Sequence, residues 1–221
     1  ILDHFLILYL HYGIYTNKDY GNVRGLELKL DYSLNNLFVQ TNYTYQFTRG
    51  NADNPAQTFN RQGASIDEVI RFIPMSWDQR HTFNLSLGYN TEMHGVTVTG
   101  YYNSGTPYTF SPQGESNLAL LNLYPNNDYK PSSYYADLSG YINLPKILGI
   151  KPRIDFLIYN LTDRYNEYGV NSETGRSYTA VVNETELLSH RSNFNTYEDR
   201  YKDPSMFSSP RQIKVGVTVL F

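Results

Sequence analysis

Residues 210–221 read PRQIKVGVTVLF, and the strict alternation in this stretch guides the interpretation of the whole chain. Successive side chains of an extended strand point to opposite faces, so one face of this segment is apolar and the other is polar or small. Such a strand suits the wall of a barrel in lipid, with the apolar face toward the acyl chains. It suits equally the last strand of a soluble β-sandwich. The apolar face comprises Ile213, Val215, Val217, Val219 and Phe221.

The composition narrows the function classes. The chain has 221 residues, with 18 Lys and Arg against 21 Asp and Glu, and its formal net charge is -3. This balance gives no support to a nucleic-acid-binding surface, which is usually basic. The absence of cysteine excludes disulfides, thiolate metal ligands and cysteine nucleophiles. The 22 Tyr and 11 Phe are typical of membrane-interface girdles and of surfaces that bind sugars or peptides.

The same alternation recurs along the chain. It is clearest in residues 23–34 and 37–48, where Asn35 and Asn36 form the tight reversal of a hairpin. Residues 1–15 are apolar but alternate poorly, as if the sequence entered a longer protein within a strand. The mean hydropathy is -0.50, and no uninterrupted apolar run is long enough for a membrane helix. We expect eight strands, at residues 1–15, 23–34, 37–48, 81–90, 96–102, 134–144, 153–160 and 212–221.

Short and long connections between these strands follow one another in turn. The long ones are residues 49–78, 103–132 and 165–209. Transmembrane barrels have short periplasmic turns and long extracellular loops, whereas a soluble sandwich has no reason to collect its long loops at one end. The sequence therefore predicts an all-β fold, a transmembrane antiparallel β-barrel in the cell outer membrane of a Gram-negative bacterium. Residues 1–221 would form part of that single barrel domain.

Several short sequence motifs, taken in their order along the chain, resemble the C-terminal barrel region of TonB-dependent outer-membrane receptors. The similarity is greatest to the Bacteroidetes-type branch, which includes receptors with a carboxypeptidase-regulatory-like front domain. The resemblance implies about the last eight strands of a 22-stranded barrel that is occluded by an N-terminal plug. The motifs are VRGLEL at 23–28, DQRHTFN at 78–84, NSGTPYT at 103–109, NLTDRYN at 160–166 and the terminal Phe221.

The resemblance also implies a function and a set of partners. The function is energy-coupled uptake of a nutrient ligand across the outer membrane. The partners are outer-membrane lipid, the protein's own plug and remaining strands, the TonB complex through parts not present here, and a surface lipoprotein. Two alternatives stay open: a complete eight-stranded barrel serving as an adhesin or structural protein, and a receptor-like protein acting in secretion or surface assembly.

Three groups of residues are candidates for function. Aromatic residues of the long connections are candidates for ligand contact: Tyr108, Phe110, Tyr124, Tyr129, Tyr178, Phe194, Tyr197 and Tyr201. Polar strand residues are candidates to face the lumen and hydrogen-bond the plug: Glu27, Lys29, Asp31, Gln40, Asn42, Gln46 and Asn84. The third group, by family resemblance, is the terminal strand that barrel-assembly machinery recognises: Ile213, Val215, Val217, Val219 and Phe221.

The sequence shows no pattern of residues that indicates a catalytic site or a bound cofactor. His81 and Ser86, with Asp78 nearby, invite comparison with a serine hydrolase. An odd separation along a strand directs the His81 and Ser86 side chains to opposite faces, so we predict that the protein is not an enzyme. The five histidines are dispersed without the spacing of metal ligands, and Gly-rich phosphate loops are absent. The sequence therefore predicts neither a metal nor a cofactor.

Overall fold

The computed structural model describes residues 19–63, 71–111, 124–146, 149–181 and 203–220. Its main feature is one antiparallel sheet in which each long strand pairs with the next long strand along the chain, in the order β1-β2-β4-β5-β8-β9-β10. The two-residue strand β3 (Ile73–Pro74) pairs with the end of β2 and makes the sheet eight-stranded. The long strands are β1 (Gly21–Leu34), β2 (Leu37–Gly50), β4 (His81–Asn90), β5 (His94–Asn103), β8 (Ser133–Asn143), β9 (Lys151–Tyr159) and β10 (Gln212–Leu220).

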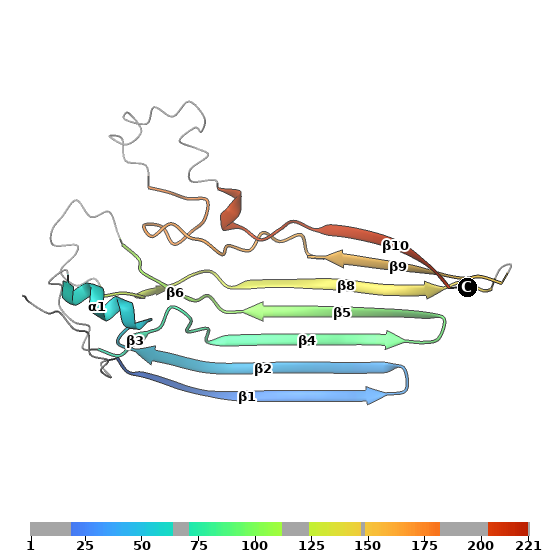
Figure 1. Cartoon of the computed structure of the whole chain (residues 1–221), viewed down its shortest axis with the longest axis horizontal. Helices are drawn as coiled ribbons and strands as arrows, with labels where there is room; N and C mark the ends of the chain where they lie inside the picture. The colour runs from blue at the N-terminus through green and yellow to red at the C-terminus, as the bar shows by residue number, and fades with distance from the viewer. Residues whose placement is uncertain (1–18, 64–70, 112–123, 147–148, 182–202, 221) are drawn as a thin grey trace, which may run out of the picture.

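The sheet has a turn end and a loop end (Figure 1). At the turn end, the reversal between β1 and β2 places Asn35 at φ 51°, a left-handed conformation that Asn adopts more readily than most residues. The loop end carries the three long connections. These contain short elements: α1 (Pro55–Gly63), the paired strands β6 (Pro107–Tyr108) and β7 (Asp128–Tyr129), and the 3-10 helix η1 (Pro204–Met206).

The strand register gathers apolar side chains on one continuous side of the sheet, which we call the apolar face. All the registers between the long strands run without a slip in parity, so alternate residues of every strand stay on the same side. One row across this face reads Leu28, Tyr43, Phe83, Tyr102 and Tyr134, and another reads Ile142, Ile154 and Val217.

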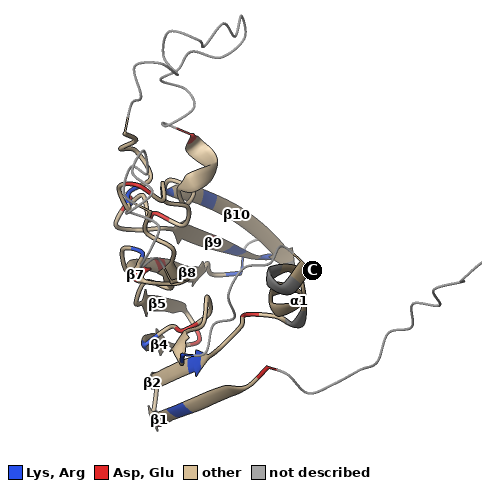
Figure 2. Ribbon diagram, turned by 90° about the vertical axis from the view of Figure 1, so that its left-hand side faces the viewer, with Lys and Arg blue, Asp and Glu red and all other residues tan. Residues whose placement is uncertain are grey.

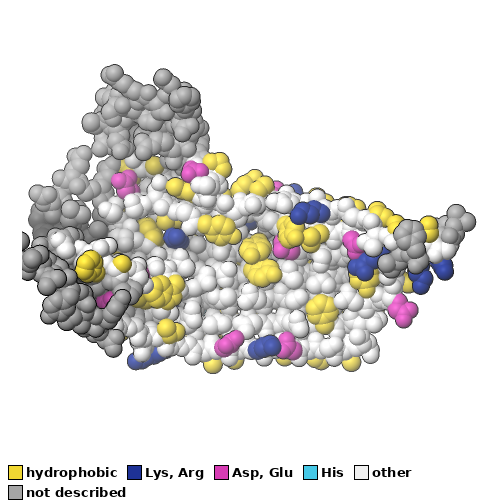
Figure 3. Space-filling view, viewed as in Figure 1, with side chains coloured by type: hydrophobic (Ala, Val, Ile, Leu, Met, Phe, Trp, Pro, Cys, Tyr) yellow, Lys and Arg dark blue, Asp and Glu magenta, His cyan; other side chains and the backbone are white. Residues whose placement is uncertain are grey.

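The opposite side of the sheet, the polar face, carries charged, amide, hydroxyl and tyrosine side chains. Figure 3 shows this face, where acidic and basic side chains are scattered over the strands and alternate along β1 at its lower edge. A row across it reads Lys29, Asn42, Asn84, Tyr101 and Tyr135. The two faces therefore differ in chemistry over the whole width of the sheet.

The apolar face is exposed on the edge strands β1 and β10 and half-buried among neighbouring side chains over much of the central strands. Leu28 is 55% exposed and Val215 is 70% exposed, although both lie well inside their strands. Among the described residues, the buried hydrophobic side chains are Ile73 and Met75, which lie at the loop end. A sheet in water normally buries one face against a second layer of structure. The described chain instead combines a wide apolar surface with a very small apolar core.

The sheet is a single layer with β1 and β10 at its two edges (Figure 2). Each edge strand is paired on one side only within the described residues. Such an edge presents unpaired backbone N–H and C=O groups and is a template for a further strand. The antiparallel β-sheet expected from the sequence is thus confirmed, while its closure into a barrel stays a prediction.

Seven of the eight predicted strands are confirmed, with ends that shift by one or two residues. The eighth, at residues 1–15, lies outside the described residues. Asn160 was expected within a strand but lies just beyond β9, because its φ of 51° is incompatible with an extended ladder. The long connections also contain regular elements, namely helices and short strands.

An aromatic side chain covers a glycine on the polar face. Phe38 of β2 lies directly opposite Gly88 of β4, and a Cβ at position 88 would lie 2.1 Å from Phe38 Cε1. We expect Gly88→Ala to destabilise the fold by about 1–3 kcal/mol through overpacking, although alanine normally suits a strand better than glycine. Urea unfolding in detergent measures the effect. The Gly88→Ala/Phe38→Ala double variant should lose less unfolding free energy than the two single variants lose together, because removal of the ring makes room for the new methyl group. Strictly additive losses of unfolding free energy would contradict this packing.

Candidate functional site

The candidate site is a pocket of about 460 Å³ on the polar face, at the loop end of β8, β9 and β10. Its size is typical of sites for small organic ligands. The strands provide Tyr135, Asp137, Tyr159, Gln212 and Lys214. The third long connection, which in the structure comprises residues 160–211 between β9 and β10, provides Asn160, Asn166, Tyr168, Ser208, Ser209 and Pro210. We call this set the loop-end pocket.

Strand periodicity explains the strand side of the pocket. Tyr135 and Asp137 are two residues apart on β8, so both side chains point to the polar face. The Tyr135 ring stacks on Tyr101 of β5, with ring centroids 4.8 Å apart. Lys214 Nζ lies 5.0 Å from the ring centroid of Tyr159, within the range of a cation–π interaction. Neighbouring strands thereby orient an aromatic surface beside an ammonium group.

Asn160 fixes the beginning and the end of the third connection. Its side chain is buried, and Nδ2 donates to the carbonyl oxygens of Arg164 at 2.9 Å and Ser209 at 3.0 Å. Its backbone N–H donates to Asp137 Oδ1 at 2.8 Å. The left-handed backbone at Asn160 turns the chain away from β9, and these three bonds hold the connection against the pocket floor.

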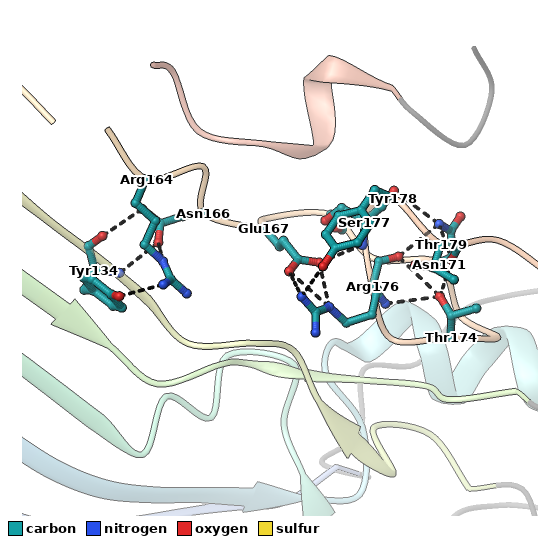
Figure 4. A network of polar contacts seen from close by, with 11 residues as sticks. Tyr134, Arg164, Asn166, Glu167, Asn171, Thr174, Arg176, Ser177, Tyr178 and Thr179 are labelled. Carbon is teal, nitrogen blue, oxygen red and sulfur yellow. Dashed lines mark hydrogen bonds and ion pairs between the residues drawn. The ribbon is translucent and has the colours of Figure 1, made fainter. Parts of the chain in front are cut away.

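Asn166 ties the same connection to β8 (Figure 4). Its side chain is 1% exposed and forms a reciprocal pair with the backbone of Tyr134: the Tyr134 N–H donates to Oδ1 at 3.0 Å, and Nδ2 donates to the Tyr134 carbonyl at 2.9 Å. The Arg164 guanidinium carbon lies 4.0 Å from the Tyr134 ring centroid, and Nη1 donates to the Tyr134 hydroxyl at 2.6 Å. A buried amide thus extends the strand ladder into the loop.

A second polar cluster in this connection surrounds Glu167 (Figure 4). The Arg176 guanidinium donates through Nη2 to Glu167 Oε1 at 2.6 Å and through Nε to Oε2 at 3.2 Å. The Ser177 N–H donates to Glu167 Oε2 at 2.8 Å, and the Tyr178 hydroxyl accepts from Arg176 at 2.8 Å. Burial acts to raise the pKa of Glu167, but the hydrogen bonds from Arg176 and Ser177 outweigh it, so that pKa is lower than usual.

A separate network joins the first two long connections. Asp78 is completely buried and accepts from the Thr48 N–H at 2.6 Å, from Arg80 Nε at 3.1 Å and from the Tyr129 hydroxyl at 2.8 Å. Burial, followed by the hydrogen bond to Asp78, raises the pKa of Tyr129 above its usual value. This hydroxyl therefore keeps its proton at neutral pH and links the second connection to the end of β2.

The loop-end pocket has the chemistry of a recognition site for a polar organic ligand. Three phenol rings offer apolar faces and hydroxyl groups, and Asp137 and Lys214 place opposite charges in the same pocket. Asn166 and Gln212 add amides that both donate and accept hydrogen bonds. In the part of the chain that the structure describes, no three His, Cys, Asp or Glu side chains gather as metal ligands would.

The aromatic residues predicted for ligand contact lie in different surroundings. Tyr129 belongs to the Asp78 network, Tyr108 donates to Asp128 Oδ2 at 3.2 Å, and the backbone of Phe110 bonds the Asn127 side chain. Tyr124 and Tyr178 are 44% and 49% exposed at the loop end. Phe194, Tyr197 and Tyr201 lie outside the described residues. The described members are not brought together into one site.

The residues predicted to face the lumen share the polar face. Asn42 Nδ2 donates to Glu27 Oε1 at 2.7 Å, and Lys29 Nζ lies 3.0 Å from Asp31 Oδ2. The strand register places the whole set on that face: Glu27, Lys29, Asp31, Gln40, Asn42, Gln46 and Asn84.

The predicted assembly signal lies on the edge strand β10. Its side chains are exposed on the apolar face, by 65% at Ile213, 70% at Val215, 68% at Val217 and 42% at Val219. Phe221 lies outside the described residues.

The constellation of a serine hydrolase is not formed. His81 pairs with Tyr45 on the apolar face, whereas Ser86 pairs with Gln40 on the polar face, and the register between them contains no bulge. The Tyr43 hydroxyl lies 2.8 Å from His81 Nδ1, and Asp78 is held by the network described above.

Sequence reasoning missed the loop-end pocket. Tyr135 and Tyr159 are tyrosines at polar-face positions of their strands, and this departure from alternating chemistry is the signal that marks them. Tyr168 had no such signal, because its position depends on how the third connection folds back on β8.

Comparison with protein-family models, curated proteins and solved structures finds no match to the chain. The described residues include no helix with the length and hydropathy of a membrane-spanning helix.

The Glu167 cluster predicts a pH-dependent loop. The pKa of Glu167 is lower in the folded loop than its ordinary value of 4.5, so the stabilisation is present above that value and is lost as the pH falls through the folded pKa. We expect Glu167→Gln to reduce the hydrogen-exchange protection of the Ser177 amide at neutral pH. In strong acid, where the wild-type carboxyl group is protonated, the protection of this amide should be similar in the variant and in wild type. Thr162→Ala, in the same connection, is the control. An equal difference from wild type at both pH values would contradict the role of the carboxylate.

Proposed function

We propose that this chain forms part of the wall of a transmembrane β-barrel in the outer membrane of a Gram-negative bacterium. The observation that carries the proposal is the apolar face, which runs across seven strands of a single-layered sheet in the described residues (Figure 2). Burying one large aliphatic side chain is worth about 1.5–3 kcal/mol, so exposing this face to water would be strongly unfavourable. Acyl chains outside and water or protein inside match the two faces.

The two ends of the sheet support an orientation. Short turns at one end and long connections at the other match the periplasmic and extracellular rims of outer-membrane barrels (Figure 1). The polar networks around Asp78, Asn160 and Glu167 would then hold the extracellular loops. In this orientation the loop-end pocket opens on the extracellular side of the lumen.

Within this class, we favour a TonB-dependent receptor that takes up a nutrient ligand. Three of the sequence motifs that resemble this family, at residues 78–84, 103–109 and 160–166, fall at strand ends of the sheet. The polar face would contact the plug, the TonB complex would act through parts not present here, and a surface lipoprotein would meet the loops.

The direction of the two faces can be tested with neighbouring positions on β1. A photo-crosslinking residue at Leu28 should label lipid in outer membranes that contain the full protein. The same residue at Lys29 should label protein, because its side chain points to the opposite face. Mass spectrometry of the crosslinked peptides identifies the partner. Crosslinks from position 28 to a segment of the protein's own interior would overturn the membrane proposal.

The uptake function can be tested in cells that express the full protein. Solutes that such cells remove from a complex nutrient extract, and that a deletion strain leaves, are candidate ligands. We expect an uncoupler of the proton-motive force to abolish their removal, and Tyr159→Ala/Tyr168→Ala to slow it about tenfold or more, since both rings line the loop-end pocket. Tyr165→Ala, in the same connection but outside the pocket, is the matched control. Removal that is insensitive to the uncoupler would contradict energy-coupled uptake.

A further inference from the structure

A second hollow lies on the apolar face at the loop end, where β1 meets β2. Its volume is about 680 Å³. We call it the arginine groove, and its lining residues are Asn22, Arg24, Gly25, Leu26, Tyr45, Phe47, Arg49 and Phe72. It is distinct from the loop-end pocket, which lies on the polar face between β8 and β10.

Two arginines on this face break its apolar pattern. Arg24 is two residues before Leu26, and Arg49 is two residues after Phe47, so both stand at apolar-face positions. In the seven long strands as described, no other Lys, Arg, Asp or Glu occupies a position on that face. Arg24 pairs with Phe47 and Arg49 with Asn22, which makes the two arginines diagonal neighbours, about 7–8 Å apart at Cα.

The position of the pair along the strands is informative. An arginine on the lipid side of a barrel is strongly unfavourable at the bilayer midplane but costs little near the interface. Both arginines lie at the loop end, where the polar headgroups of a leaflet would be. An adjoining hollow of about 380 Å³ shares Arg49 and Phe72 and adds Arg71, so the positive character continues into the first long connection.

The groove combines charge with apolar contact area. Arg24 Nε donates to Asn22 Oδ1 at 2.8 Å, which orients the guanidinium. Tyr45 and Phe47 pack edge to face with ring centroids 4.9 Å apart, and Phe72 packs on Tyr20 at the same distance. Guanidinium groups bind phosphate with paired hydrogen bonds, and the rings provide a surface for the first carbons of acyl chains.

We propose that the arginine groove binds the phosphate of an anionic lipid headgroup in the leaflet at the loop end. The acyl chains of this lipid lie along Leu26, Leu28 and Leu30, which continue the groove down the apolar face. The inference rests on the proposed membrane location. It goes further by assigning a specific lipid site to β1 and β2, where a uniform barrel wall would need only apolar residues.

The test uses the full protein in nanodiscs made of equal parts phosphatidylcholine and phosphatidylglycerol. Native mass spectrometry counts the lipids that stay bound as others are stripped away. Wild type should retain phosphatidylglycerol in preference to phosphatidylcholine, and Arg24→Gln/Arg49→Gln should weaken its retention about tenfold, since hydrogen bonds to charged groups are individually strong. The matched control is Lys151→Gln/Arg153→Gln, which removes the same charge from the polar face at the turn end and should leave retention unchanged.

Each outcome has a separate meaning. Equal retention of the two lipids by wild type, or equal losses in both double variants, overturns the headgroup site while the protein still enters the bilayer. Failure of wild type to enter nanodiscs of either lipid overturns the membrane proposal itself. A further arm adds inorganic phosphate: displacement of phosphatidylglycerol at millimolar phosphate would assign the groove to free phosphate and overturn a lipid ligand. Circular dichroism confirms that both variants keep their β-structure.

Discussion

The structure depends on one constraint, the two-residue period of side chains in antiparallel strands that pair without a slip. Because the register keeps its parity from β1 to β10, every second residue of seven strands contributes to the same surface. With β1 and β2 in place, a shift of one residue between β2 and β4 would bring Asn84 among the leucines and Phe83 among the amides. If the two sides of the sheet face surroundings of opposite polarity, such a shift is unfavourable on both sides.

Polar interactions, and very little apolar packing, organise the loop end. Asp78, Asn160 and Asn166 are each buried at or beyond a strand end, where backbone groups leave the sheet ladder and need new partners. Their side chains supply these partners and draw the connections onto the sheet. Buried groups of this kind are costly when a partner is missing, so the networks favour a single arrangement of the described loops. The loop-end pocket forms where one such arrangement meets the polar face.

The same division of faces gives the two proposed sites different tasks. The loop-end pocket lies on the polar face, where tyrosines and charged groups remain accessible to a ligand from water. The arginine groove lies on the apolar face, where, in the proposed membrane location, charge would be tolerated only close to a headgroup layer. Ligand uptake would use the first surface, and anchoring of the barrel rim would use the second. Both proposals follow from the position of each side chain along its strand and from the face on which it stands.

The sequence by itself determined the strands and their faces, because an alternating pattern such as Ile213 to Val219 is local and repeats every two residues. It also determined the grouping of Glu27, Lys29 and Asp31 on one face and the separation of His81 from Ser86. Only the tertiary structure decided which loop residues meet. Tyr168 reaches the pocket, and Tyr129 reaches Asp78, through contacts between segments distant in sequence, and such contacts leave no period for a sequence pattern to reveal.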